Sequence, residues 1–160
     1  MEELIKFLIE VGKLKDTKRK GAMLYGKKDV ESTAEHTFRM ILMAWILGKK
    51  KKLNVEEVIK LALVHDLCEV YAGDVTPYDG FLPKTKKERD KFVRTWPVFP
   101  HEVRKKWYER KYKREHEGLK KLVAKLPTNL REEILRLWLN YEKGLTKEGR
   151  FVRQVDRVEN

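Results

Sequence analysis

The sequence has little cysteine and no long apolar run, and both shortages narrow what the protein can be. Cys68 is the only cysteine, which excludes an internal disulfide framework and is typical of a reducing compartment. No stretch approaches the roughly 18 consecutive apolar residues of a membrane span. The opening stretch, MEELIKFLIEVGKLK, carries acids where a signal peptide carries bases. We therefore expect a cytoplasmic protein with no membrane partner.

Glutamine is also scarce, whereas lysine and glutamate are abundant, a bias typical of hyperthermophile proteins. The net charge is +12, and a basic surface concentrates any polyanion, so the charge alone does not choose between nucleic acid, an anionic membrane and an acidic small molecule. We assign most of this charge to a solvated shell. A length of 160 residues suits one domain with a real core.

Alternation with period two is missing, and apolar residues recur at helical spacing instead. This pattern predicts an all-α fold, a bundle of about six to eight helices. Two loops are expected, at 15–31 and 75–84, because glycine and proline punctuate them. The expected helices are 2–14, 32–48, 54–73, one or two short helices within 85–112, 113–126, 129–143 and 146 to the end.

Several of these boundaries have a capping signal. Ser32 and Glu35 match a capping box, Asn54 is a favourable N-cap, and Gly48 is expected to end the helix before it. Apolar stripes within the helices are expected to form the core. Their residues are Leu4, Phe7, Leu8 and Val11, then Ala34, Phe38, Ile41 and Trp45, then Met40, Met43 and Leu47, with Trp138 later in the chain.

Polar residues interrupt the most apolar helix. His65 and Asp66 lie in the middle of VEEVIKLALVHDLCEVYA, and Glu69 follows one turn later. A buried carboxylate without a partner costs several kcal/mol, so these groups need compensation, and a bound cation supplies it. Neighbouring helical residues lie about 100° apart, so both side chains can reach one ion between them.

His36 and Asp156 repeat this anomaly on two other helices. His36 lies in an apolar helix, and Asp156 interrupts a stripe of Phe151, Val152 and Val155. A buried histidine is often only hydrogen-bonded, and Asp156 could pair with a neighbouring arginine, but three helices each placing a polar group on an apolar face favour a shared ion. Two nitrogens with carboxylate oxygen suit Mn, Fe, Co, Ni or Zn rather than Ca.

The strings AEHTFRM, ALVHDLCEVYAGDVTPYDG, LREEILRLWLNYEKG and FVRQVDRVE resemble the signature blocks of the HD-domain superfamily of phosphohydrolases, in particular its 5'-deoxynucleotidase branch. The resemblance implies one divalent metal ion (Mn, Co, Zn, Ni, Fe or Mg) on His36, His65, Asp66 and Asp156. It implies hydrolysis of (deoxy)nucleoside 5'-monophosphates by attack of a metal-bound water, and a homodimer. Nucleic acid is not the expected partner.

The same resemblance implies further roles. Glu69 and Asp74 match the acidic pair that positions or activates the water, and Arg19 resembles an arginine that contacts phosphate. Glu142 matches an acidic position near the substrate, although an exposed carboxylate at a helix end is an equal alternative. The tryptophan expected soon after Arg19 is replaced by the residues 21–23, which leaves sugar and base preference open.

We expect the chain to form one HD domain over 1–160. Two features of its organisation differ from the family pattern. The basic segment 85–112 looks like an insertion and could be a lid or a dimer contact. Asp156 lies only four residues before Asn160, where helix ends fray, so we expect the natural chain, or a partner chain, to continue beyond it.

Two rival functions stay open. An HD phosphodiesterase or a (p)ppGpp-type hydrolase commonly needs a second metal, for which only His101 and His116 remain, both in charged surroundings. The other rival is a non-enzymatic nucleotide-binding or nucleic-acid-binding module with a structural metal, supported by the net charge and the aromatic residues within 85–112.

Overall fold

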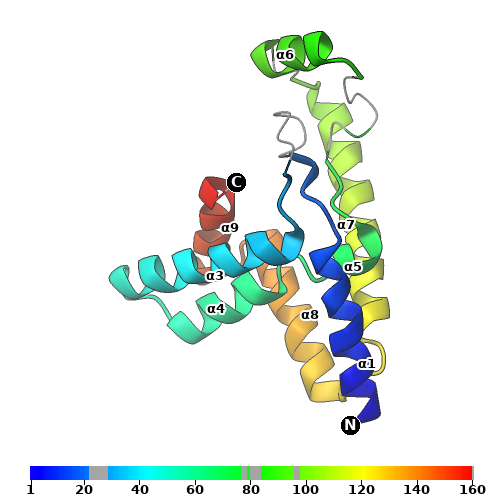
Figure 1. Cartoon of the computed structure of the whole chain (residues 1–160). Helices are drawn as coiled ribbons and strands as arrows, with labels where there is room; N and C mark the ends of the chain where they lie inside the picture. Colours follow the sequence, from blue (N-terminus) through cyan, green and yellow to red (C-terminus); the bar gives the residue numbers. More distant parts are fainter. Residues whose placement is uncertain (22–28, 77–78, 80–83, 96–97, 160) are drawn as a thin grey trace.

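The computed structural model describes residues 1–21, 29–76, 79, 84–95 and 98–159, and this part of the chain is helical, with one isolated bridge between Lys18 and Ser32 (Figure 1). The expected all-α class is confirmed. The elements are α1 (Glu2–Val11), the 3-10 helix η1 (Gly12–Lys15), α3 (Thr33–Lys50), α4 (Val55–Val64), α5 (Glu69–Ala72), α6 (Lys86–Thr95), α7 (His101–Val123), α8 (Thr128–Lys143) and α9 (Lys147–Glu159).

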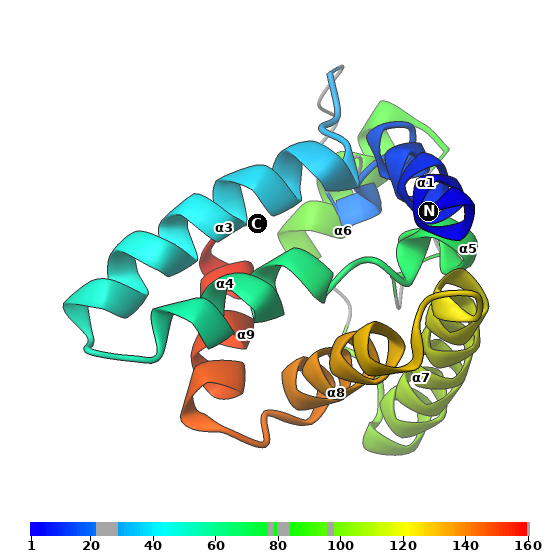
Figure 2. The same cartoon turned by 90° about the horizontal axis from the view of Figure 1, so that it is seen from below.

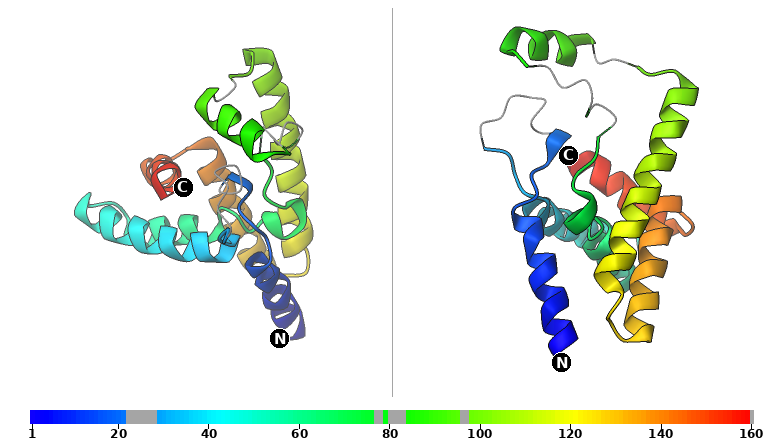
Figure 3. Two further views of the ribbon diagram at one scale, coloured as in Figure 1. Left: turned by 45° about the horizontal axis from the view of Figure 1, so that its top comes forward. Right: turned by 90° about the vertical axis from the view of Figure 1, so that its right-hand side faces the viewer.

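The centre of the bundle is built by α3, α4, α8 and α9. α3 packs against α4 and α9, and α4 also packs against α8 and α9. Figure 2 shows α3 and α4 side by side, with α9 next to both. α5 packs against α7, which rises from the bundle and carries α6 at its far end (Figure 3). The common core contains Met40, Leu61, Leu119, Trp138 and Val152, each at most 1 % exposed.

The capping signals are confirmed. The Ser32 hydroxyl accepts a hydrogen bond from Glu35 N (3.3 Å), and the Glu35 carboxylate accepts one from Ser32 N (2.6 Å), which completes the capping box. The Asn54 side chain accepts from Glu57 N at 3.2 Å. These two caps fix where α3 and α4 begin, and therefore the rotation of each helix about its axis.

Gly48 does not end its helix as expected, because α3 continues to Lys50. Gly48 is buried, and a Cβ built on it would lie 3.3 Å from Val58 Cγ1. The glycine thus permits the close approach of α3 and α4.

The expected core stripes are only partly confirmed. Met40 and Trp138 are buried, and Ala34, Ile41 and Met43 are partly buried against the core. The exposed members of the stripes are Phe38 (66 %), Trp45 (46 %) and Leu47 (39 %) of α3 and Leu8 (64 %) of α1. α4, α9 and η1 pack against α3 but leave these α3 side chains exposed. The remaining face is apolar in sequence but uncovered in this chain.

The segment 85–112 contains α6 and the first half of α7, and α7 runs without a break through the expected boundary at 112–113. Pro100 precedes its first residue, and its only glycine, Gly118, packs against the turn that holds Cys68. Residues 22–28 of the loop expected at 15–31, and residues 77–78 and 80–83 of the loop expected at 75–84, lie outside the described residues. None of the described helices is long and apolar enough to cross a membrane.

Candidate metal centre

His65 and Asp66 lie in a turn between α4 and α5, rather than in the middle of one continuous helix as expected. After Val64 the backbone hydrogen bonds shorten to three-residue spacing, with Leu67 N donating to Val64 O at 3.2 Å and Glu69 N donating to Asp66 O at 3.0 Å. Three-residue bonding tightens the backbone compared with an α-helix. The turn ends the straight run of α4 where the two polar side chains face the interior.

The four expected ligands converge although they come from three separate stretches. His36 Nε2 lies 3.2 Å from His65 Nε2 and 3.3 Å from Asp156 Oδ1. Asp66 Oδ2 lies 2.9 Å from His65 Nε2 and 3.8 Å from His36 Nε2. Among the described residues, His36, His65 and Asp156 offer ligand atoms within 4.8 Å of one another, as a shared metal ion requires.

The chemistry of the two imidazoles fits a cation. His65 Nδ1 lies 2.7 Å from the carbonyl oxygen of Ala62, which can only accept, so this nitrogen carries the proton. His36 Nδ1 is bonded to the Glu159 carboxylate, which also accepts. The two Nε2 lone pairs then face each other inside the protein, an arrangement that positive charge between them stabilises.

Charges around the cluster keep the carboxylates ionised. Burial opposes ionisation of Asp66, but His65 and Arg19 outweigh it and hold the pKa of Asp66 well below its usual range. Burial also opposes ionisation of Asp156, but its proximity to the imidazoles of His36 and His65 lowers its pKa. Both groups are therefore anionic at neutral pH.

Arg19 lies against these carboxylates, where the resemblance expects a phosphate contact. Its Nη1 donates to Asp66 Oδ2 at 2.9 Å, and its Nη2 lies 4.0 Å from Asp156 Oδ1. A guanidinium has five donors, so it can hold a carboxylate and a phosphate oxygen together. The expected phosphate contact stays a prediction, and Arg19 is in position for it.

Glu69 and Asp74 lie beside the cluster on α5 and just after it. Glu69 is 4 % exposed and accepts a hydrogen bond from Thr33 Oγ1 at 2.7 Å. Burial, followed by the charges of Asp66 and Asp74, raises the pKa of Glu69 well above its usual value. Asp74 accepts from Lys20 N at 2.6 Å, and burial raises its pKa too. A positive φ of 67° at Gly73 turns the chain between them.

A cavity of about 420 Å³ lies beside the cluster, and one residue of the cluster, Asp156, forms part of its wall. Tyr141 and the expected substrate residue Glu142 line it from α8, and Tyr108, Lys111 and Tyr112 line it from α7. The Tyr141 hydroxyl donates to Asp156 Oδ2 at 2.8 Å. This volume is within the range of small-molecule sites.

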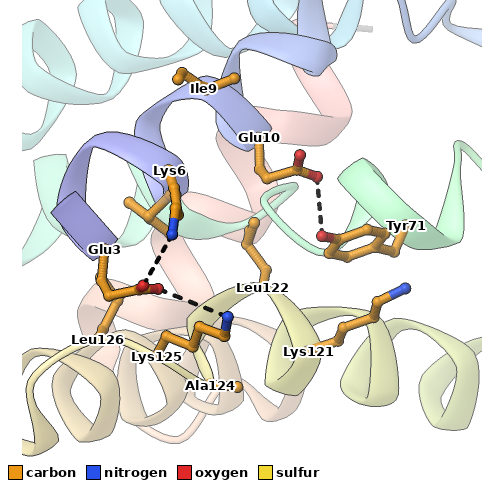
Figure 4. Close-up of a pocket in the computed structure, with 11 residues that line it drawn as sticks. Glu3, Lys6, Ile9, Glu10, Tyr71, Lys121, Leu122, Ala124, Lys125 and Leu126 are labelled. Carbon is orange, nitrogen blue, oxygen red and sulfur yellow. Dashed lines mark hydrogen bonds and ion pairs between the residues drawn. The ribbon is translucent and has the colours of Figure 1, made fainter.

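A second cavity of about 510 Å³ lies between α1 and the C-terminal part of α7 (Figure 4). Its charged rim is paired, because Lys6 and Lys125 both reach Glu3, at 3.2 and 3.9 Å, and the Tyr71 hydroxyl donates to Glu10 at 2.9 Å. It shares no lining residue with the metal cluster. The cavity beside Asp156 is therefore the one that the cluster can serve.

The two remaining histidines lie away from the cluster, and two other groups near the site were not expected from the sequence. His101 is exposed, and His116 stacks on Tyr112 and Trp138, so the described structure brings neither to the four ligands. The sequence reasoning missed Glu159, which contacts His36, and the pair Lys111–Glu115, whose Nζ and Oε1 lie 2.5 Å apart. The signals for Glu159 were its i+3 spacing from Asp156 and its i+4 spacing from the buried Val155, and both equally fit a fraying helix end.

Comparison with known proteins gives one consistent result. A family model described as an HD domain matches residues 11–160. The chain is 34 % identical over 156 residues to the 5'-deoxynucleotidase HDDC2 of Homo sapiens, covering 98 % of this chain and 64 % of that protein. It is 31 % identical to the 5'-deoxynucleotidase HDDC2 of Dictyostelium discoideum, covering 99 % of this chain and 74 % of that one. The chain thus spans a little under two thirds of the human relative.

Solved structures give the same fold. A conserved hypothetical protein from Pyrococcus furiosus superposes with a TM-score of 0.65 at 27 % identity, covering 97 % of this chain and 78 % of that chain. A predicted metal-dependent phosphohydrolase from Magnetospirillum magnetotacticum superposes with a TM-score of 0.70 at 24 % identity, covering 98 % of this chain and 68 % of that chain. The second likeness supports the fold alone.

Proposed function

This chain belongs to the HD-domain family, and from that membership we propose that it is a metal-dependent phosphomonoesterase that converts (deoxy)nucleoside 5'-monophosphates to nucleoside and phosphate. The observation that carries the proposal is the convergence of His36, His65, Asp66 and Asp156, of which Asp156 also lines a cavity of about 420 Å³. The substrate class follows the 5'-deoxynucleotidases that this chain resembles over nearly all of its length.

We propose one divalent ion (Mn, Co, Zn, Ni, Fe or Mg) held by these four side chains. Such an ion lowers the pKa of a nearby water and offsets the charge of a phosphate. Two imidazoles and two carboxylates form a borderline donor set, which suits a transition metal and leaves positions for water and substrate. The facing Nε2 atoms of His36 and His65 support a cation at this point.

The protein's own groups would then bind phosphate and move protons. Arg19 would hold phosphate oxygens, because its guanidinium lies against the carboxylates of the cluster. A water oxygen forms a bond to phosphorus, the bond between phosphorus and the 5' oxygen breaks, and the leaving oxygen needs a proton. Glu69 and Asp74 would take the proton from water and return one to the leaving oxygen, because both are buried carboxyl groups beside the cluster.

The cavity next to Asp156 would take the nucleoside. Tyr108, which is 64 % exposed, offers an aromatic face for a base, and Glu142 offers an acceptor for a sugar hydroxyl. Tyr108 comes from segment 85–112, so we propose that this segment contributes a wall of the substrate cavity. The chain would act as a single HD domain, with α7 as part of the site.

The test is a phosphate-release screen over ribo- and deoxyribonucleoside 5'-monophosphates, with Mn, Co, Mg and Zn in parallel. We expect release that Asp66→Asn abolishes and that Asp90→Asn, a matched change on the exposed surface of α6, leaves unchanged. Full activity after exhaustive chelation would refute the metal-dependent mechanism. Salt-dependent binding of oligonucleotides without phosphate release would favour the non-enzymatic rival.

We also propose that two copies associate through the uncovered face of α3. Four apolar residues spaced along this helix, Phe38, Leu42, Trp45 and Ile46, are 66, 39, 46 and 64 % exposed. A contiguous apolar helix face is typical of an association surface, and a second copy offers the same face by two-fold symmetry. Light scattering should find a dimer that Trp45→Glu dissociates, whereas Leu145→Glu in the α8–α9 connection leaves it intact. A monomeric wild type would refute this.

A further inference from the structure

A chain of charged side chains leads away from His36 on the side opposite the metal cluster. The Glu159 carboxylate accepts a hydrogen bond from His36 Nδ1, and its other oxygen accepts from Nε and Nη2 of Arg39. Arg39 Nη2 also lies 2.8 Å from a Glu31 carboxylate oxygen. We propose that Glu159, held by Arg39, is a positioning residue that fixes the ring orientation and tautomer of His36 for metal binding. This inference rests on the proposed metal site.

The physical reason is the two-ended character of imidazole. A neutral ring carries one proton, and a partner that only accepts at Nδ1 leaves the lone pair on Nε2. An anionic partner also makes the ring a stronger donor to a metal. His65 reaches the same tautomer through a neutral carbonyl, Ala62 O at 2.7 Å, so of the two imidazoles only His36 has a carboxylate at Nδ1.

Burial makes Arg39 necessary to this arrangement. The side chain of Glu159 is 2 % exposed, whereas that of Arg39 is 55 % exposed. A buried carboxylate is costly without compensation. Arg39 supplies that charge from the surface, because its guanidinium bridges Glu31 and Glu159.

The same contacts argue against a second metal site. Glu31, His36 and Glu159 offer ligand atoms within 4.8 Å of one another, which is a spacing that could hold an ion. The Arg39 guanidinium contacts both carboxylates, so positive charge is already provided there by the protein. The geometry therefore assigns Glu159 to orientation of a ligand and not to ligation.

Glu31 extends the connection towards the phosphate site. Its carbonyl oxygen accepts a hydrogen bond from Arg19 N at 3.1 Å, while its carboxylate pairs with Arg39. Contacts through Glu31, Arg39 and Glu159 thus connect the backbone of Arg19 to the ring of His36. Displacing Glu159 should disturb His36 directly and Arg19 only through Glu31.

The experiment measures cobalt binding by equilibrium dialysis, with no nucleotide present, for wild type, Glu159→Ala, Glu159→Gln and the exposed matched control Glu132→Gln on α8. We expect about a 100-fold weaker Kd for Glu159→Ala and about a tenfold weaker Kd for Glu159→Gln, which keeps an acceptor but loses the charge. Glu132→Gln should bind as wild type does. Nitrogen-15 NMR of the metal-free protein should show the Nδ1-protonated tautomer of His36 in wild type and a mixture in Glu159→Ala.

The outcomes separate the hypotheses. Circular dichroism of the metal-free proteins checks folding, and should Glu159→Ala fail to fold, Glu159→Gln decides alone. A Kd unchanged in the folded variants with an unchanged tautomer would overturn the positioning role. Two cobalt ions per wild-type chain, one of them lost in Glu159→Ala, would overturn it in favour of ligation. Cobalt binding without phosphatase activity would refute only the proposed function, and no cobalt binding by wild type would refute both.

Discussion

The contact between α7 and the turn behind the metal cluster can be tested through Gly118. A Cβ built on this residue would lie 3.0 Å from the carbonyl oxygen of Cys68 and 3.5 Å from Ala72 N. Both are backbone atoms of the turn and of α5, and they cannot rotate away as the end of a side chain could. Gly118→Ala therefore has to push α7 and the turn apart.

Two opposing effects set the size of the change. Alanine is favoured over glycine inside a helix by about 1 kcal/mol, whereas overpacking a close contact costs about 1–3 kcal/mol. We expect the steric cost to exceed the helical gain, leaving a net loss of about 1–2 kcal/mol in the free energy of unfolding. For a domain of this size, this lowers Tm by roughly 2–8 °C.

Gly12→Ala is the matched control. Gly12 has a helical φ of −56°, and a Cβ built there meets nothing within 4 Å. Alanine should raise stability by about 0.4–1 kcal/mol at such a position. Both variants are measured metal-free by thermal and denaturant unfolding, so that binding does not contribute. A Gly118→Ala protein as stable as wild type, or more stable, would refute the argument from close approach.

Three further predictions use other parts of the molecule. Ser32→Ala removes the capping box of α3 and should cost about 1 kcal/mol in denaturant unfolding, while Ser32→Gly should cost only a few tenths. Burial raises the pKa of Glu115 from 4.5 to about 7 despite its partner Lys111, so between these pH values the folded state binds a proton that the unfolded state has lost. The free energy of unfolding should therefore decrease as the pH rises from about 4.5 to about 7, by at most about 1.4 kcal/mol per pH unit. Glu115→Gln should remove this slope in pH-dependent unfolding. Metal at about 100 times its Kd should raise the free energy of unfolding by about 2.7 kcal/mol, and a chelator should reverse this gain in a thermal shift assay. An unchanged Tm would count against a metal site that forms only in the folded state.

The helix starts could be predicted because their chemistry is local. Ser32 with Glu35 and Asn54 with Glu57 form their contacts within four residues, so no knowledge of the fold is needed. The break at His65 could not be predicted in the same way. No proline or glycine marks it, and the switch to three-residue hydrogen bonds depends on the packing of α5 against α7.

The face of α3 shows the limit of periodicity. Apolar residues follow this helix on most sides, which predicts burial on most sides. α4, α9 and η1 pack against α3, and Met40 is buried among its neighbours whereas Trp45 stays exposed. Sequence spacing shows which residues of a helix are apolar, but which of them other helices cover depends on the complete fold.

The cost of burying charge explains why the cluster itself was predictable whereas its supports were not. His36, His65 and Asp156 each stand out because they interrupt apolar stripes, where a polar group is expensive without a partner. Glu159 has the same need in the folded chain, since its side chain is 2 % exposed. In the sequence it lies at helical spacing after Val152 and Val155, but it falls in the last turn of α9, where helix ends fray and burial is not expected. Its partner Arg39 lies 120 positions away. Candidate metal ligands can thus be recognised in the sequence as polar residues among apolar neighbours. The groups that orient them, such as Glu159 and Arg39, can be recognised only in the fold, where α3 and α9 meet.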